Sequence, residues 1–217
     1  VKKALLFGAS GLVGGHLLNE LIKENYYSKI KIFVRSELKI SDPKIEIIRT
    51  DFNNLQNHKD DIKGDDCFLC IGTTKQNSPD KNEYRKVELE MPKEIAQIAK
   101  SNSINSFVFI SSGYADPKSS GDYLKFKGQV EEELKRLNFT KLGIMRPSFL
   151  MGNRKEKRIG EKIGILVFKL LSPLLLGPLK KMKPINSEIV AKAMVAFVQS
   201  DTQKNTFESN EILKIIK

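Results

Sequence analysis

The sequence has few of the residues that build metal and disulfide sites. Its 217 residues include two Cys, two His and no Trp. The cysteines, Cys67 and Cys70, lie in the stretch DDCFLCIG, which predicts a buried strand. Side chains three residues apart on a strand point to opposite faces, so this pair cannot chelate an ion together. With only His16 and His58 elsewhere, we expect no metal site and two reduced core thiols.

The sequence also lacks an apolar run long enough to cross a membrane. The best candidate, IGILVFKLLSPLLLGPL, is interrupted by Lys169, Pro173 and Pro178, whereas a spanning helix needs roughly 20 apolar residues. No signal peptide precedes the first predicted strand, so we expect a cytoplasmic protein. The basic, apolar segment 154–183 is expected to cover a ligand pocket or a subunit interface. Contact with a membrane surface is its less favoured alternative.

The charge is strongly positive but mostly scattered. The net charge is +11, with 40% hydrophobic and 29% charged residues, a composition typical of a soluble globular protein. The sequence shows neither a groove-reading helix nor an aromatic platform for RNA, so we expect no nucleic-acid partner. The charge is also compatible with a membrane surface or an anionic small molecule as partner, and we expect a monomer or a homodimer.

Short apolar runs alternate with helical patterns along most of the chain. Strands are predicted at 2–9, 29–36, 44–50, 65–72, 105–112 and 141–148. Helices are predicted at 12–25, 91–102, 121–137 and 187–200. Nearly continuous apolar strands separated by helices indicate an α/β protein with a doubly wound parallel sheet, the Rossmann fold.

The last third of the chain departs from this alternation. We expect a dinucleotide-binding core at 1–149 and a small substrate lobe or lid at 150–183. Residues 184–217, with a helix and a short strand, would pack back on the core, which makes one structural domain overall.

The first predicted strand ends in FGASGLVGG, which places Gly8, Gly11 and Gly14 at three-residue intervals. A strand before the glycines and a helix after them is the context that dinucleotide binding requires. Small residues let a phosphate approach the backbone N–H groups at the helix N-terminus.

The second strand ends in FVRS. An NAD-binding protein usually carries an acidic residue near this point to bind the ribose 2′-hydroxyl. Arg35 and Ser36 favour a 2′-phosphate instead, so we expect NADP to be preferred over NAD, although Glu37 lies nearby.

Five motifs occur in a specific order: GASGLVG, CIGTT after the fourth strand, FISS after the fifth, Tyr123 with Lys127, and RPSFLMG after the sixth. In these motifs the chain resembles the extended or atypical short-chain dehydrogenases/reductases. It is most similar to the Tat-interacting-protein-like oxidoreductases. The segment KVELEMPKEI departs from the pattern, since it lacks the Asn that many extended members place ahead of this helix.

The resemblance implies that residues from each motif bind the cofactor. They are Gly8, Ser10, Gly11, Leu12, Val13 and Gly14 at the pyrophosphate, Asp51 and Phe52 at the adenine, Cys70, Ile71, Gly72 and Thr73 along its middle, and Ser111, Pro147 and Ser148 nearer the nicotinamide.

The resemblance also implies a Ser-Tyr-Lys catalytic site. Tyr123 and Lys127 share one helix face at a spacing of four residues, and an ammonium beside a phenol favours its ionised form. Tyr123 would exchange a proton with the substrate oxygen, and Lys127 would also hold the nicotinamide ribose. Ser112 would orient the substrate, with Ser111 the less favoured serine because alternation points one of the two away.

These features predict an NADP-dependent oxidoreductase that acts on an unidentified small carbonyl compound or alcohol. The alternative is a non-catalytic NADPH sensor or a regulatory protein-interaction module. An intact Ser112, Tyr123 and Lys127 set favours the enzyme, because a sensor has no need of it.

Overall fold

The computed structural model describes residues 1–152 and 183–216. Seven strands form one sheet in the order β3-β2-β1-β4-β5-β6-β9, and every neighbouring pair is parallel. The strands are β1 (Lys2–Phe7), β2 (Tyr27–Val34), β3 (Ile45–Arg49), β4 (Asp66–Leu69), β5 (Ser106–Ile110), β6 (Lys141–Arg146) and β9 (Thr206–Glu208). The predicted α/β fold with a doubly wound parallel sheet is confirmed.

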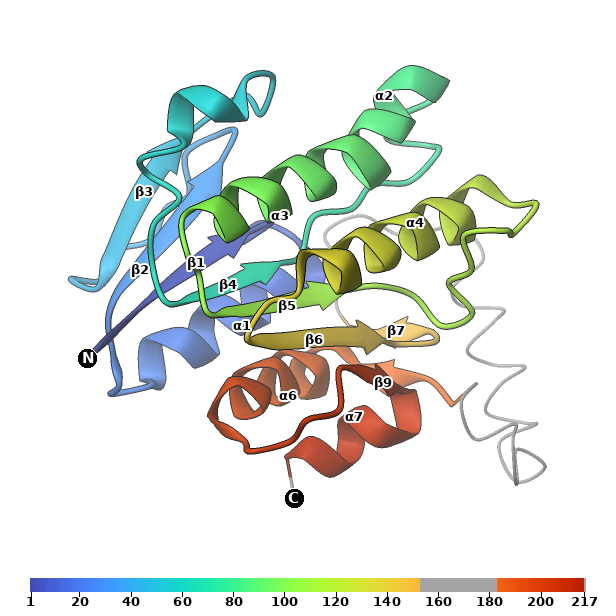
Figure 1. Cartoon of the computed structure of the whole chain (residues 1–217). Helices are drawn as coiled ribbons and strands as arrows, with labels where there is room; N and C mark the ends of the chain where they lie inside the picture. Colours follow the sequence, from blue (N-terminus) through green and yellow to red (C-terminus); the bar gives the residue numbers. More distant parts are fainter. Residues whose placement is uncertain (153–182, 217) are drawn as a thin grey trace.

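Helices cover both faces of this sheet (Figure 1). One face carries α1 (Leu12–Lys23), α6 (Ser187–Gln199) and α7 (Ser209–Ile215). The other carries α3 (Met91–Ser101), α4 (Asp122–Leu137) and the 3-10 turn η1 (Leu55–His58). No helix of the described residues is long and apolar enough to cross a membrane.

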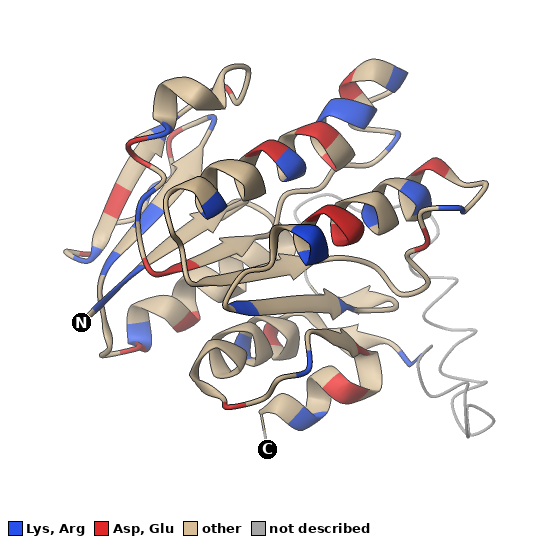
Figure 2. Ribbon diagram, viewed as in Figure 1, with Lys and Arg blue, Asp and Glu red and all other residues tan. Residues whose placement is uncertain are grey.

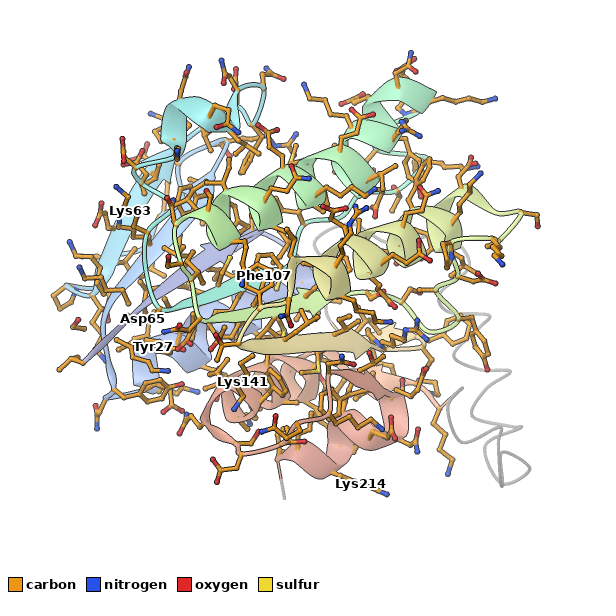
Figure 3. The ribbon with its side chains drawn as sticks, in the orientation of Figure 1. Tyr27, Lys63, Asp65, Phe107, Lys141 and Lys214 are labelled. Atoms are coloured by element: carbon orange, nitrogen blue, oxygen red, sulfur yellow. The ribbon has the colours of Figure 1, made fainter. Side chains whose placement is uncertain are left out.

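The core is split by the sheet into two apolar layers. Alternate residues of β1 serve the two layers: Ala4 and Leu6 pack toward α1 and α6, and Leu5 and Phe7 pack toward α3 and α4. All four are fully buried. Phe107 of β5, labelled in Figure 3, belongs to the second layer. Burial on both faces explains why the strands read as nearly continuous apolar runs.

The sheet order places a switch point between β1 and β4. From β1 the chain proceeds outward to β2 and β3, and it then returns to β4 on the other side of β1. The loops that leave β1 and β4 therefore diverge at the carboxyl ends of the strands. Ligands of open α/β sheets bind in the crevice that this divergence creates.

Several short elements were not predicted. The helix α2 (Lys81–Arg85) continues through a π-helical turn, η2 (Lys86–Glu90), into α3. The side chain of Asp80 caps α2 by accepting hydrogen bonds from Asn82 N and Glu83 N, both at 2.9 Å. A two-stranded sheet pairs β7 (Leu150–Met151) with β8 (Ile185–Asn186). These elements and α7 are too short to show a periodic apolar pattern.

The expected lid at 150–183 lies almost entirely outside the described residues. The structure describes only β7, Gly152 and Lys183 from that range. Residues of both charge signs occur along α3 and α4 (Figure 2).

Candidate functional site

A cleft of about 770 Å³ lies at the carboxyl ends of the strands, at the switch point. Its walls come from the turn after β1, the ends of β2 and β3, the loop after β4, and the segment from α2 to α3. A volume of this size is within the range of cofactor sites. The lining residues that carry the argument are Gly8, Gly11, Arg35, Asp51, Phe52 and Gly72.

The three motif glycines have different structural roles. Gly8 has φ +86°, and a Cβ there would lie 2.7 Å from the Cys70 carbonyl carbon. A Cβ on Gly14 would lie 2.0 Å from Gly8 O, so this glycine permits close packing of α1 on the turn and does not line the cleft. Gly11 faces the cleft, and its N–H donates to Gly8 O at 3.0 Å. Only glycine suits positions 8 and 14.

The N-terminus of α1 is arranged to receive an anion. Its N-cap is Gly11, which has no side chain to cap the helix, and its first turn has no acidic residue. The unpaired N–H groups and the positive end of the helix dipole therefore face the cleft. Ser10 is exposed beside Gly11, whereas Val13 packs in the core and can contribute only backbone.

The residues that follow β2 and β3 bring charged side chains to the cleft. Arg35 is exposed and lines the cleft just after β2, while the adjacent Ser36 is exposed but not in the lining. Asp51 and Phe52 follow β3, and Phe52 adopts φ 61°. The N–H groups of Asn53 hold the pKa of Asp51 below its usual range, so Asp51 is an anion there.

The loop after β4 forms another wall of the cleft. Cys70, Ile71, Gly72 and Thr73 all line the cleft. Cys70 packs against the layer of α1 and α6, and Cys67 packs in the layer of α3 and α4, as the strand geometry predicted. Burial raises the pKa of the Cys70 thiol to about 12. Both thiols are free, and no cluster of metal ligands occurs among the described residues.

Tyr123 and Lys127 lie together on α4. The Lys127 ammonium is 5.9 Å from the centre of the Tyr123 ring and 5.0 Å from the centre of the Phe109 ring. Lys127 is only 3% exposed, whereas Tyr123 is 39% exposed. A Cβ on Gly72 would lie 3.8 Å from Lys127 Nζ, so the ammonium is at the wall of the cleft. A buried cation therefore sits beside a solvent-accessible phenol.

Glu88, which the sequence analysis missed, is the partner of Lys127. Its Oε2 atom forms an ion pair with Lys127 Nζ at 3.0 Å, and the Glu88 side chain is completely buried. Burial acts to lower the pKa of Lys127, but the attraction of Glu88, together with that of Tyr123 and Cys70, outweighs burial and the pKa is raised above its ordinary value. The sequence feature that could have identified Glu88 is an acidic residue between two apolar ones, Val87 and Leu89, in the segment that lacks the expected Asn.

The two serines after β5 have different environments. The Ser111 hydroxyl is 2% exposed and donates to Glu131, which also pairs with Arg146. This network turns Ser111 Oγ into the protein interior. Ser112 is half-buried, and within residues 1–152 and 183–216 its hydroxyl makes a single 3.3 Å hydrogen bond, to Gly113 O. Of the two, Ser112 has the hydroxyl available to a ligand.

The RPSFLMG motif begins at the end of β6 and neighbours Ser112. Gly113 N donates to Pro147 O at 2.8 Å, which joins the loops after β5 and β6. The Ser148 hydroxyl donates to Lys183 O at 2.6 Å, and its N–H donates to Ser209 Oγ at 2.8 Å. The cleft lining does not include Pro147, Ser148, Ser112, Tyr123 or Lys127.

Comparison with protein families gives one extensive match. The model of a family described as NAD(P)H-binding matches residues 8–201. Protein HTATIP2 of Rattus norvegicus is 32% identical over 164 residues, which cover 74% of this chain and 67% of that protein. Protein FMP52 of Candida glabrata is 27% identical over 228 residues, which cover 98% of this chain and 95% of that protein. The resemblance to Tat-interacting-protein-like NAD(P)-binding oxidoreductases is thereby confirmed.

Solved structures share the fold at low identity. MoeE5 in complex with UDP-glucose and NAD aligns with a TM-score of 0.67 and 18% identity, over 98% of this chain and 80% of that chain. The Bordetella bronchiseptica enzyme WbmH in complex with NAD+ aligns with a TM-score of 0.71 and 14% identity, over 95% and 74% of the two chains.

One expectation from the sequence is wrong. The cytoplasmic location is contradicted by the FMP52 relatives of Candida glabrata, Eremothecium gossypii and Saccharomyces cerevisiae, all of which are named mitochondrial proteins.

Proposed function

Because the chain belongs to the NAD(P)H-binding family, we propose that it is an NADP-dependent oxidoreductase of the short-chain dehydrogenase/reductase type. Its substrate would be a small carbonyl compound or alcohol. The observation that carries the proposal is the exposed Tyr123 phenol beside the buried Lys127 ammonium, at the wall of a cleft that a glycine turn opens. The sensor alternative has no comparable feature in its favour.

Successive segments of the cleft would bind successive parts of a dinucleotide. The turn at Gly8 and Gly11 and the N-terminus of α1 would hold the pyrophosphate through backbone N–H groups. The loop from Cys70 to Thr73 would lie beside the cofactor's middle, with Asp51 and Phe52 at the adenine.

Preference for NADP is supported by the basic side chains at the adenosine end. Arg35 follows β2 directly, at the point where the ribose 2′-position is recognised in this fold. Arg85 and Lys86 line the same cleft, although Arg85 is paired with Glu90 and Lys86 donates to Asn53. A guanidinium can bind a phosphate through two parallel hydrogen bonds, which makes Arg35 the strongest candidate.

The chemistry assigned to Ser112, Tyr123 and Lys127 is carbonyl reduction or its reverse. Bound NADPH supplies the hydride. Tyr123 donates its phenolic proton to the oxygen as negative charge develops there, and in the reverse direction it accepts that proton. Lys127 stabilises the negative charge left on the phenol and holds the nicotinamide ribose, while Ser112 donates a hydrogen bond that orients the substrate oxygen.

The proposed function is tested by a turnover screen with a labelled cofactor. Ketones and aldehydes are incubated with NADPH that carries deuterium at both hydrogen positions of the hydride-donating carbon. We expect at least one compound to be reduced and its product to contain one deuterium by mass spectrometry. Binding of NADPH without deuterium transfer to any of these compounds would contradict catalysis on this class of substrate.

A further inference from the structure

The ion pair between Glu88 and Lys127 is buried in the protein interior. Glu88 lies in the π-helical turn η2, Lys127 in α4, and their side chains are 0% and 4% exposed. Removing two charges from water is costly, and a buried pair often stabilises a protein less than apolar residues of similar size would. The stability of the fold therefore does not explain why this ion pair is present. Its position at the cleft indicates a functional reason.

Glu88 is bound on both of its carboxylate oxygens. Oε1 accepts a hydrogen bond from Thr73 N at 2.5 Å, and Oε2 faces the ammonium at 3.0 Å. Within the described residues Oε2 has no hydrogen-bond partner, and its contact with Lys127 is an ion pair. The carboxylate thus connects the loop that lines the cleft to the lysine of α4.

Gly72 leaves the room that this connection needs. A Cβ at this position would lie 3.3 Å from Glu88 Oε1 and 3.8 Å from Lys127 Nζ. Contacts of 3.0–3.4 Å are tighter than most real Cβ contacts, so any larger residue would press on the carboxylate. Because Gly72 itself lines the cleft, the ion pair lies directly behind the cleft surface.

Glu88 lies in a π-helical turn. Such a turn contains an extra residue compared with an α-helical one, and such turns are frequent at functional sites. Glu88 and the adjacent Leu89 are both buried, at 0% and 3% exposed. The helix that runs from α2 to α3 thereby presents a carboxylate to α4.

We propose that Glu88 is the positioning residue of the catalytic lysine: its carboxylate fixes the Lys127 ammonium at the wall of the cleft and balances its charge. This role rests on the proposed function, in which Lys127 serves Tyr123 and the cofactor ribose. A consequence is that Tyr123 faces the field of an ion pair and not that of a lone cation. A second consequence is that Lys127 remains protonated at every pH at which the protein works.

Glu88 is the neighbouring ionisable group that balances the charge of Lys127. In the described part of the chain, the groups that act most strongly on the ammonium are Glu88 from η2, Tyr123 from its own helix, and Cys70 from the loop after β4. Burial raises the pKa of Cys70 to about 12, so its thiol is neutral at working pH. Only Glu88 supplies a permanent negative charge among these three.

The test is a titration of Lys127 in the Glu88→Gln variant. Glutamine keeps an oxygen for Thr73 N–H but removes the charge, so a buried ammonium would lose its partner. In protein labelled with carbon-13 at the lysine ε position, we expect the Lys127 midpoint to fall by at least about one pH unit, since burial favours the neutral amine. The Lys127 signal is identified by its absence in Lys127→Met. Glu94→Gln, an acidic residue of α3 outside the cleft lining, is the control and should leave the midpoint unchanged.

An unchanged Lys127 midpoint in Glu88→Gln would overturn the proposal. If that variant does not fold, Glu88→Asp decides, because it keeps the charge on a shorter side chain. Because the shorter side chain holds its carboxylate farther from the ammonium, a lowered midpoint supports the proposal and a midpoint at the parental value contradicts it. The titration needs neither cofactor nor substrate. Failure of the parent protein to bind NADPH would therefore refute the proposed function while the role of Glu88 is still decided.

Discussion

The most unusual single residue is a lysine that is buried and yet charged. Lys127 is 3% exposed, and lysines in such places tend to lose their proton unless an anion is close. The Glu88 carboxylate at 3.0 Å is that anion. Together they provide a fixed polar group beside Tyr123, which is the arrangement that positioned proton transfer needs.

At the same scale, Arg35 is predicted to determine the choice of cofactor. We expect the parent protein to bind NADPH about tenfold or more tightly than NADH, because a charge-assisted hydrogen bond contributes about 1.5–3 kcal/mol. Arg35→Ala should remove this preference while NADH affinity stays nearly the same. Calorimetric titration of both cofactors measures it. Equal affinities in the parent, or an undiminished preference in the variant, would exclude Arg35 from this role.

How much of the site the sequence could predict depends on whether a contact is local. The Tyr123 and Lys127 pair follows from helical spacing, and the glycine turn follows from its flanking strand and helix. The contact of Glu88 with Lys127 depends instead on how η2 packs against α4, and no local pattern encodes that packing. Alternation along β5 predicted that one serine turns away, and Ser111, bound to Glu131, is that serine.

At the scale of elements, the turn between β1 and α1 determines where a phosphate can approach. The strand patterns predicted all six strands from β1 to β6, because burial on both faces produces long apolar runs. The patterns did not predict α2, η2, β7 or β8, since elements of two to five residues have no measurable periodicity. Two of these short elements, α2 and η2, nevertheless form one wall of the cleft, and η2 carries Glu88.

Alanine substitutions at Gly14 and Gly11 should show which of the two glycines is required for packing. Gly14→Ala places a Cβ 2.0 Å from Gly8 O, so the helix must shift. We expect a loss of about 1–3 kcal/mol in the free energy of unfolding, typical of overpacking. Gly11→Ala, with its nearest contact at 3.2 Å and φ −79°, is the matched control and should change this free energy by less than about 1 kcal/mol. Urea denaturation measures both, and equal losses would contradict the assigned packing role of Gly14.

At the scale of the whole molecule, two apolar layers enclose groups that ionise only at high pH. Cys67 is fully buried in one layer, and burial raises its pKa well above its ordinary value. Tyr27, 1% exposed in the other layer, has its pKa raised by burial and by Asp66, to which its hydroxyl donates at 2.8 Å. In both cases the folded protein retains a proton that the unfolded chain releases.

The pH dependence of stability follows from that difference. A group with a raised folded pKa stabilises the protein fully below its unfolded pKa, which for a thiol is about 9. The contribution is lost as the pH rises toward the folded value, by at most about 1.4 kcal/mol per pH unit for each group. We expect the free energy of unfolding to fall from pH 9 to 10.5, and less steeply in Cys67→Ala. Urea denaturation across this range measures the slope, and identical slopes in the two proteins would refute the contribution of Cys67.

In the proposed mechanism, Tyr123 transfers the proton in an NADPH-dependent reaction. The most direct measurement compares the parent with Tyr123→Phe on a carbonyl compound that the parent reduces, with NADPH affinity determined in parallel. We predict nearly parental NADPH binding and at least about a hundredfold loss of turnover, because positioned acid–base catalysis contributes about 10²–10⁴-fold. Lys127→Ala should lower both quantities, since its ammonium serves the ribose as well. A Tyr123→Phe variant that turns over at the parental rate would show that Tyr123 only packs on its helix and that the proton comes from elsewhere.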